Sequence, residues 1–146
     1  MSLMQWQNNG WLRPHSTSRE EIGNLLSIAR RDLSDAGSQD ISNDWRFGIA
    51  YNAALKLCTA LLYAEGYRPT HAQPHYRALQ ALPLILGADH TANAAYLEAC
   101  RVKRNTVEYD YVGAATNADA DELIEFVESL ERDVLQWLEK RHPELT

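Results

Sequence analysis

The sequence predicts an all-α protein, an up-down helical bundle of four to five helices. Apolar residues recur every three or four positions through several long stretches, which is typical of helices that bury one face. The alternation of apolar and polar residues that indicates strands does not stand out. Short loops join the stretches and favour antiparallel neighbours. The 146 residues fit one domain, which we expect at residues 17–146 after an extended segment at residues 1–16.

The first helix is predicted to begin after Ser18, whose hydroxyl can form a capping box with Glu21. It should end at Gly37, because glycine is common just beyond a helix. The second helix is expected from about Trp45 to Glu65. It carries apolar residues on more than one side, so we predict that it is the central helix of the core.

The third helical region should start near residues 70–71 and break near Pro83–Gly87, because proline interrupts a helix. A further helix is expected at about residues 92–109, and the last one at about residues 119–141. Large aromatic side chains on these helices should pack in the core. Those expected there are Trp45, Tyr51 and Trp137.

The charge is distributed unevenly along the chain. The net charge is −6, with −8 in residues 105–146 and +3 in residues 68–104. This pattern argues against a uniformly basic surface for duplex nucleic acid, but it leaves room for a local positive site. No stretch is apolar enough to span a membrane and no signal peptide is seen, so we expect a cytoplasmic protein with reduced, buried Cys58 and Cys100.

The most basic cluster lies between residues 100 and 111, near the expected end of the fourth helix. At 1.5 Å per residue its members span only about 6–8 Å along the helix axis. A guanidinium offers paired donors to phosphate oxygens, and an ammonium adds charge. The alternative is a solvated helix face on which Arg104 pairs with Glu108. The cluster consists of Arg101, Lys103, Arg104 and Asn105.

We expect a different set of side chains to face the core on this helix. They recur at spacings of three and four, so they can share one stripe. On that assignment the cations point away from the core. The expected inward residues are Ala95, Ala99, Val102 and Thr106.

Two stretches resemble the HEPN domain, the higher-eukaryote and prokaryote nucleotide-binding family. The run Trp45–Gly66 is similar to its second helix, with an aromatic residue, small and leucine-rich positions and a closing glycine. Residues Arg104–Tyr111, Arg-Asn-Thr-Val-Glu-Tyr-Asp-Tyr, resemble its signature: arginine, a polar residue, and a histidine four to six residues later. The resemblance covers roughly residues 18–140. It implies an all-α homodimer that binds RNA or nucleotide in a shared cleft, often as a toxin with metal-independent ribonuclease activity.

The chain departs from that signature at the histidine, where Tyr109 stands. A tyrosine with a pKa of about 10 is a poor base at neutral pH, so the resemblance implies binding with doubtful cleavage. It places Arg104 and Tyr109 at the catalytic positions, without a cofactor. Tyr111 stands where some members carry a tyrosine that a partner nucleotidyltransferase modifies; a cognate antitoxin is the other implied partner. The implied ligand contacts are Arg101, Lys103, Asn105 and Tyr111.

Two other classes of function stay open. The acidic last helix suits a non-catalytic protein-interaction module. A metal-binding bundle is the second, because His71 and His75 are four residues apart and His15 or His90 could supply a third ligand. The sequence has no glycine-rich phosphate loop, serine elbow or Cys-x-x-Cys pair, which disfavours P-loop hydrolases, triad hydrolases and zinc ribbons.

Overall fold

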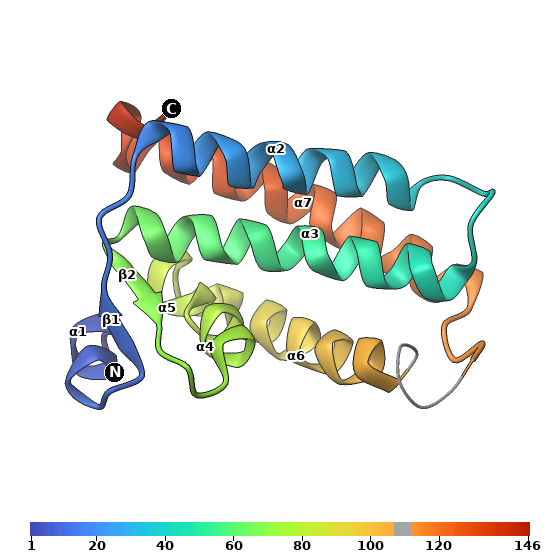
Figure 1. Cartoon of the computed structure of the whole chain (residues 1–146), viewed down its shortest axis with the longest axis horizontal. Helices are drawn as coiled ribbons and strands as arrows, with labels where there is room; N and C mark the ends of the chain where they lie inside the picture. Colours follow the sequence, from blue (N-terminus) through green and yellow to red (C-terminus); the bar gives the residue numbers. More distant parts are fainter. Residues whose placement is uncertain (107–111) are drawn as a thin grey trace.

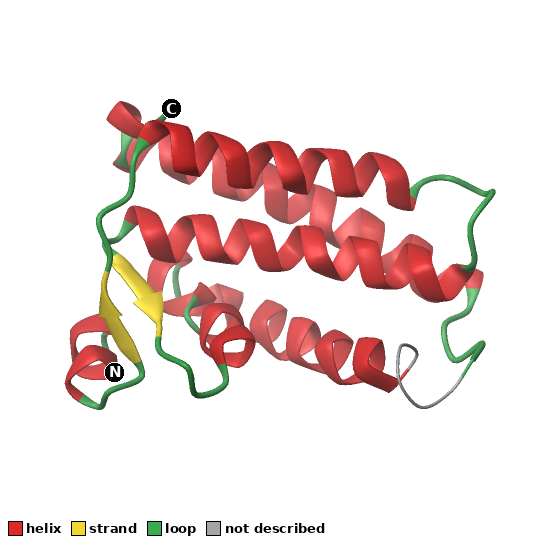
Figure 2. Cartoon of the chain, viewed as in Figure 1, coloured by secondary structure: helices red, strands yellow, loops and turns green. Residues whose placement is uncertain are grey.

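The computed structural model describes residues 1–106 and 112–146, and it confirms the predicted all-α bundle. Four helices run lengthwise and successive ones are antiparallel, with α3 in the middle (Figure 1). Figure 2 shows that helix dominates and that a short sheet lies at the end that holds the N-terminus. The four long helices are α2 (Arg19–Ala36), α3 (Asn43–Ala64), α6 (Thr91–Asn105) and α7 (Asn117–Arg141).

Capping side chains fix where three of these helices begin. The Ser18 hydroxyl accepts a hydrogen bond from the Glu21 amide at 3.1 Å, so α2 starts where the sequence predicts. Ser42 caps α3 in the same way, two residues earlier than expected. Thr116 and Asp119 form a full capping box at α7. Each cap satisfies an amide that the first helical turn leaves without a partner.

Helix α3 is the core of the bundle, as its two apolar sides predict. The expectation that no stretch is apolar enough to span a membrane was wrong by composition, because α3 reaches a mean hydropathy of 1.3 over 18 residues. However, 72% of that window is buried inside the protein. That burial is typical of the central helix of a soluble protein. Tyr51 is buried, whereas Trp45, in the first turn of α3, is 62% exposed. The prediction of a core position for Trp45 was therefore wrong, because Trp45 lies on the side of α3 that stays accessible, together with Ile49 and Asn52.

The N-terminal segment is not simply extended, as residues 1–16 were expected to be. It forms α1 (Leu3–Asn8), which a capping box between Ser2 and Gln5 starts, and then β1 (Leu12–Pro14). Strand β1 pairs antiparallel with β2 (Tyr67–Pro69). Strands of three residues are too short to show alternation in sequence, so neither could be predicted.

The third helical region is broken, as predicted, but it starts later than residues 70–71. The amide of Thr70 donates to the Trp11 carbonyl oxygen at 3.0 Å, which keeps the chain paired with the N-terminal segment beyond β2. Gln73 then adopts a left-handed conformation with φ 50°. Only after this turn does the helix begin, at Pro74.

The break itself falls at Ala81, which separates α4 (Pro74–Gln80) from α5 (Leu82–Leu86). Pro83 lies in the first turn of α5, where a missing amide donor costs nothing. Gly87, with φ 117°, ends α5 before the short 3₁₀ helix η1 (Ala88–His90). A second 3₁₀ helix, η3 (Pro143–Leu145), follows α7.

The two cysteines are buried free thiols, as expected. Burial raises the pKa of Cys58 to about 12. It raises the pKa of Cys100, beside Tyr96, to about 11. Both thiols are therefore protonated at neutral pH and act as small apolar side chains.

Candidate functional site

Helix α6 turns a different face to the core from the one expected. Its buried residues are Ala94, Leu97 and Cys100, whereas Val102 is 53% exposed. The prediction of an inward stripe through Ala95, Ala99 and Val102 was wrong. Small residues lie on two adjacent sides of this helix, and the side that also carries the larger Leu97 is the one that is buried. The consequence is that Arg101 and Arg104 are half-buried on the side that faces α3.

Arg101 lies at the wall of a hollow of about 410 Å³. Its Nε and Nη2 donate to the two carboxylate oxygens of Glu98 at 2.9 and 2.7 Å. This paired hydrogen bond raises the pKa of Arg101 and fixes the plane of its guanidinium. The hollow is also lined by Gln73, Pro74, His75 and Tyr76.

Arg104 lies one turn further along α6. Its guanidinium carbon is 5.6 Å from the centre of the Tyr51 ring, so the cation packs over the face of a core aromatic residue. Burial raises the pKa of the Tyr51 hydroxyl, while the nearby charges of Arg101 and Arg104 oppose that effect. Both cations therefore approach the same point on α3.

His75, in the first turn of α4, completes this group. Its ring is accessible, yet nearby atoms shield it enough to lower its pKa, and the positive charges of Arg104, Arg101 and Lys56 lower it further. Both effects favour the neutral form of the imidazole. We call this set, from α3, α4 and α6, the basic cleft: Lys56, His75, Arg101 and Arg104.

A further hollow of about 220 Å³ extends the basic cleft along α3 toward β2. Lys56 and His75 line it together with Arg68, which brings a fourth cation to the same groove. From Trp45 onward, the accessible residues of α3 follow a regular spacing of four and three, so they lie along one side of the helix. They are Trp45, Ile49, Asn52, Lys56, Thr59 and Tyr63.

Lys103 is placed apart from the basic cleft. Its ammonium pairs with Asp119 at 2.9 Å and lies 5.8 Å from the centre of the Phe47 ring. The Thr116 backbone amide and Lys103 lower the pKa of Asp119 to about 2. Lys103 therefore joins α6 to the start of α7, on a different side from Arg101 and Arg104.

The remaining candidate residues of the basic cluster lie at its C-terminal end. Asn105 is the last residue of α6 and is partly buried. Tyr109 and Tyr111 lie outside the described residues. Of the expected site residues, the structure therefore brings together Arg101, a predicted ligand contact, and Arg104, at a predicted catalytic position.

The histidines proposed as metal ligands are distributed among different contacts. His15 bonds to Glu21 at 2.7 Å and stacks on Tyr63, and His90 bonds to Asn93 at 3.1 Å. Neither joins the His71–His75 pair. Within residues 1–106 and 112–146, no group of three His, Cys, Asp or Glu side chains is placed to hold a metal ion.

Sequence reasoning missed Lys56 as a site residue and treated His75 only as a metal ligand. Lys56 did carry a signal, because it is the one charged residue between Phe47 and Ala64 in an otherwise apolar helix. His75 carried none, since its approach to α6 depends on the turn at Gln73.

No family model, curated protein or solved structure matches this chain. The chemistry of the site must therefore be argued from its own residues.

Proposed function

We propose that this protein binds RNA or nucleotide phosphates in the basic cleft. The observation that carries the proposal is geometric: Arg101 and His75 line one hollow, Lys56, Arg68 and His75 line the next, and Arg104 lies one turn further along α6. These cations gather in a chain with a net charge of −6. Guanidinium and ammonium groups are the side chains that bind phosphate oxygens most strongly, and a neutral imidazole can donate one further hydrogen bond. The resemblance to the HEPN family supports the same class of ligand.

The lowered pKa of His75 also supports an anionic ligand. The cations of the basic cleft act on His75 even where they are paired. Arg101 bonds to Glu98, yet the positive charges of Arg104, Arg101 and Lys56 together still disfavour a protonated His75. A phosphate diester would relieve this unfavourable potential.

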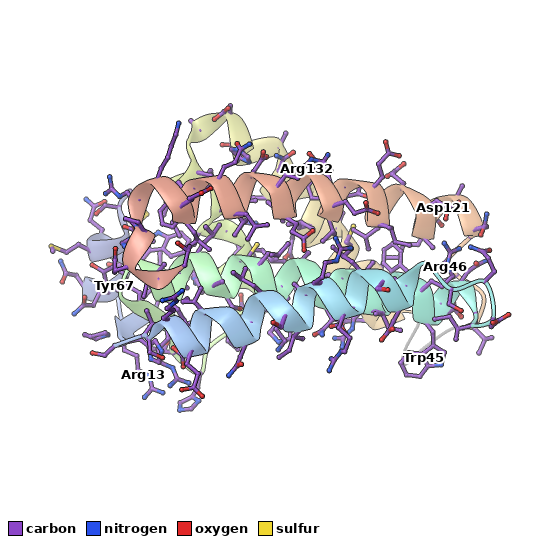
Figure 3. All side chains as sticks on the ribbon, turned by 90° about the horizontal axis from the view of Figure 1, so that it is seen from above. Arg13, Trp45, Arg46, Tyr67, Asp121 and Arg132 are labelled. Carbon is purple, nitrogen blue, oxygen red and sulfur yellow. The ribbon has the colours of Figure 1, made fainter. Side chains whose placement is uncertain are left out.

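Incubation of the purified protein with a mixed tRNA pool, without metal ions, tests the proposal. We expect a gel shift that weakens at least tenfold when Arg104 is replaced by alanine, a loss typical of a charge-assisted phosphate contact worth about 1.5–3 kcal/mol. The exposed Arg132 on α7 provides the matched control, because Arg132→Ala removes the same charge away from the cleft (Figure 3). An unaltered shift with Arg104→Ala would contradict the proposal.

A second candidate is metal-independent RNA cleavage with His75, rather than Tyr109, as the base. A neutral imidazole beside two arginines favours it. His75 would take the proton of the 2′-hydroxyl as the bond from that oxygen to phosphorus forms and the bond to the 5′-oxygen breaks. The leaving oxygen would take a proton from water, and the hydroxide formed would take the proton back from His75. The arginines would stabilise the charged phosphorane.

The same tRNA incubation separates cleavage from binding. If the second candidate is correct, His75→Gln abolishes cleavage and leaves most of the gel shift, whereas Arg104→Ala weakens both. Intact RNA with the unsubstituted protein would contradict cleavage and leave binding as the function. His71→Gln is the control, because His71 is an exposed histidine four residues earlier.

The resemblance further supports a cytoplasmic homodimer in a toxin–antitoxin or stress-related setting. Such a dimer would form through the third and fourth helical regions, where Val102 is 53% exposed on α6. Light scattering of the purified chain tests this directly, with twice the 16.6 kDa chain mass expected. A cognate antitoxin or nucleotidyltransferase would be the protein partner. A stable partner that co-purifies through the acidic last helix would favour the interaction-module alternative.

A further inference from the structure

A separate hollow of about 210 Å³ adjoins the basic cleft at the start of α3. Arg104 belongs to both, since it lines this hollow and its charge also acts on His75. A ligand with its phosphate in the basic cleft could therefore extend into the hollow. The side chains and backbone that line it come from α2, α3 and α6: Asp32, Trp45, Gly48, Ile49, Asn52 and Arg104.

Trp45 forms the outer wall of this hollow. Its indole is 62% exposed, although it is the largest apolar side chain on α3. Figure 3 shows Trp45 at the end of α3, directed away from α7 and from the core. An exposed indole beside phosphate-binding groups is a platform on which a nucleobase can stack, because every base has an aromatic face.

Asp32 lies on the α2 side and is only 6% exposed. One carboxylate oxygen accepts a hydrogen bond from Asn52 at 2.7 Å, and the other accepts from Arg31 at 3.1 and 3.2 Å. An ionised carboxylate has about four acceptor positions, so the oxygen that faces Asn52 retains capacity for a further donor. A carboxylate opposes phosphate, so its place in this hollow indicates a different part of the ligand, one rich in N–H donors.

The chemistry of the four bases makes one of them the best match. Guanine presents two adjacent donors, N1–H and the 2-amino group, which a carboxylate can accept together. Adenine, cytosine and uracil each present a single donor group beside acceptors on the same edge. Stacking on an aromatic side chain together with hydrogen bonds to this edge is a common mode of recognising unpaired RNA bases.

We infer that the hollow between Asp32 and Trp45 binds the guanine base of a nucleotide or RNA whose phosphate lies in the basic cleft. The inference rests on the proposed function and adds a base preference to it. The guanine ring would stack on Trp45. Its N1–H would donate to the Asp32 oxygen that faces Asn52, and its 2-amino group would donate to the other oxygen in place of the exposed Arg31 guanidinium. Asn52 would hold the carboxylate in place through its existing hydrogen bond.

Calorimetric titration of the full chain with GMP, IMP and AMP tests this inference. IMP differs from GMP only by the missing 2-amino group. We expect GMP to bind about tenfold more tightly than IMP or AMP, the discrimination typical of a paired hydrogen bond to a base edge. Asp32→Asn should reduce the GMP-to-IMP ratio to about one while all three nucleotides still bind. Asp35→Asn, on the exposed side of α2, is the matched control and should leave the ratio unchanged.

Trp45 supplies a second variant in case Asp32→Asn does not fold. Trp45→Ala should weaken all three nucleotides, and Trp45→Phe, which retains an aromatic face, should restore most of the affinity. Equal affinities for GMP, IMP and AMP would overturn the guanine inference and leave phosphate binding intact. Absence of binding by any nucleotide and by RNA would overturn the proposed function as well.

Discussion

At the scale of single residues, the neutral state of His75 is the feature that distinguishes this cleft from an ordinary basic surface. Partial shielding by nearby atoms and three neighbouring cations lower its pKa from an ordinary value of 6.5. The neutral imidazole can therefore accept a proton at neutral pH, and it reports on the electrostatic potential where a phosphate would bind. Its behaviour gives two predictions.

The first prediction concerns the unliganded protein. Arg101→Ala and Arg104→Ala should each raise the pKa of His75, because each variant removes a positive charge that disfavours the imidazolium. Arg132→Ala, which removes the same charge on α7, should leave that pKa unchanged. Histidine titration by NMR measures all three. An unaltered pKa in both cleft variants would mean that the arginines do not face His75.

The second prediction concerns pH and RNA affinity. A bound phosphate diester favours the imidazolium, so the pKa of His75 is higher in the complex than in the free protein and binding takes up a proton. Affinity for single-stranded RNA should therefore rise as pH falls from 7.5 to 5.5, by about tenfold for each unit of pKa difference. His75→Gln should remove most of this rise and His71→Gln should not. If the RNA affinity of His75→Gln still rises as pH falls, another group takes up the proton.

At the scale of helices, Arg46 joins three elements. Its guanidinium is buried, donating to the Ala36 carbonyl oxygen at the end of α2 at 2.8 Å, to Asn117 in α7 at 2.7 Å and to Asp121 at 2.6 Å. Figure 3 shows Arg46 and Asp121 directed toward one another. Arg46 thus fixes the end of the bundle at which Trp45, its neighbour in α3, forms the wall of the proposed base site.

The third prediction is that Arg46→Met lowers the free energy of unfolding by about 3 kcal/mol, because it leaves the buried Ala36 carbonyl and the Asn117 side chain without their donor. Asp121→Asn should cost about 1 kcal/mol or less, because that carboxylate is largely in solvent. Urea denaturation measures both. Equal losses for the two substitutions would contradict the role given to the buried guanidinium.

The sequence predicted where the helices lie along the chain better than it predicted which face of each helix is buried. Ser18 marked the start of α2, and Pro83 marked the broken third region, because caps and proline act locally. The inward face of α6 depended on packing against α3, and two registers of small residues were open. The pairing of β1 with β2, and with it the placement of His75, depended on residues more than 50 positions apart. Local pattern holds no information about such contacts.

At the scale of the whole molecule, charge is divided between two regions. Residues 105–146 carry −8, most of it on α7, whereas the basic cleft lies between α3, α4 and α6. An acidic chain with one basic cleft should bind a short single-stranded segment and not a long duplex, since a duplex would approach the acidic helix. The cations in the cleft can neutralise only two or three phosphates.

The most direct test of this account is the affinity of a short single-stranded RNA for the unsubstituted protein, Arg104→Ala and Arg132→Ala, measured by fluorescence anisotropy without metal ions over a range of salt. We predict that Arg104→Ala weakens binding at least tenfold and that Arg132→Ala binds like the unsubstituted protein. The slope of log affinity against log salt should be about −1.5 to −2, as expected when two or three phosphates are neutralised, and shallower in Arg104→Ala. Equal affinities and slopes for all three proteins would show that the cleft is not where RNA binds.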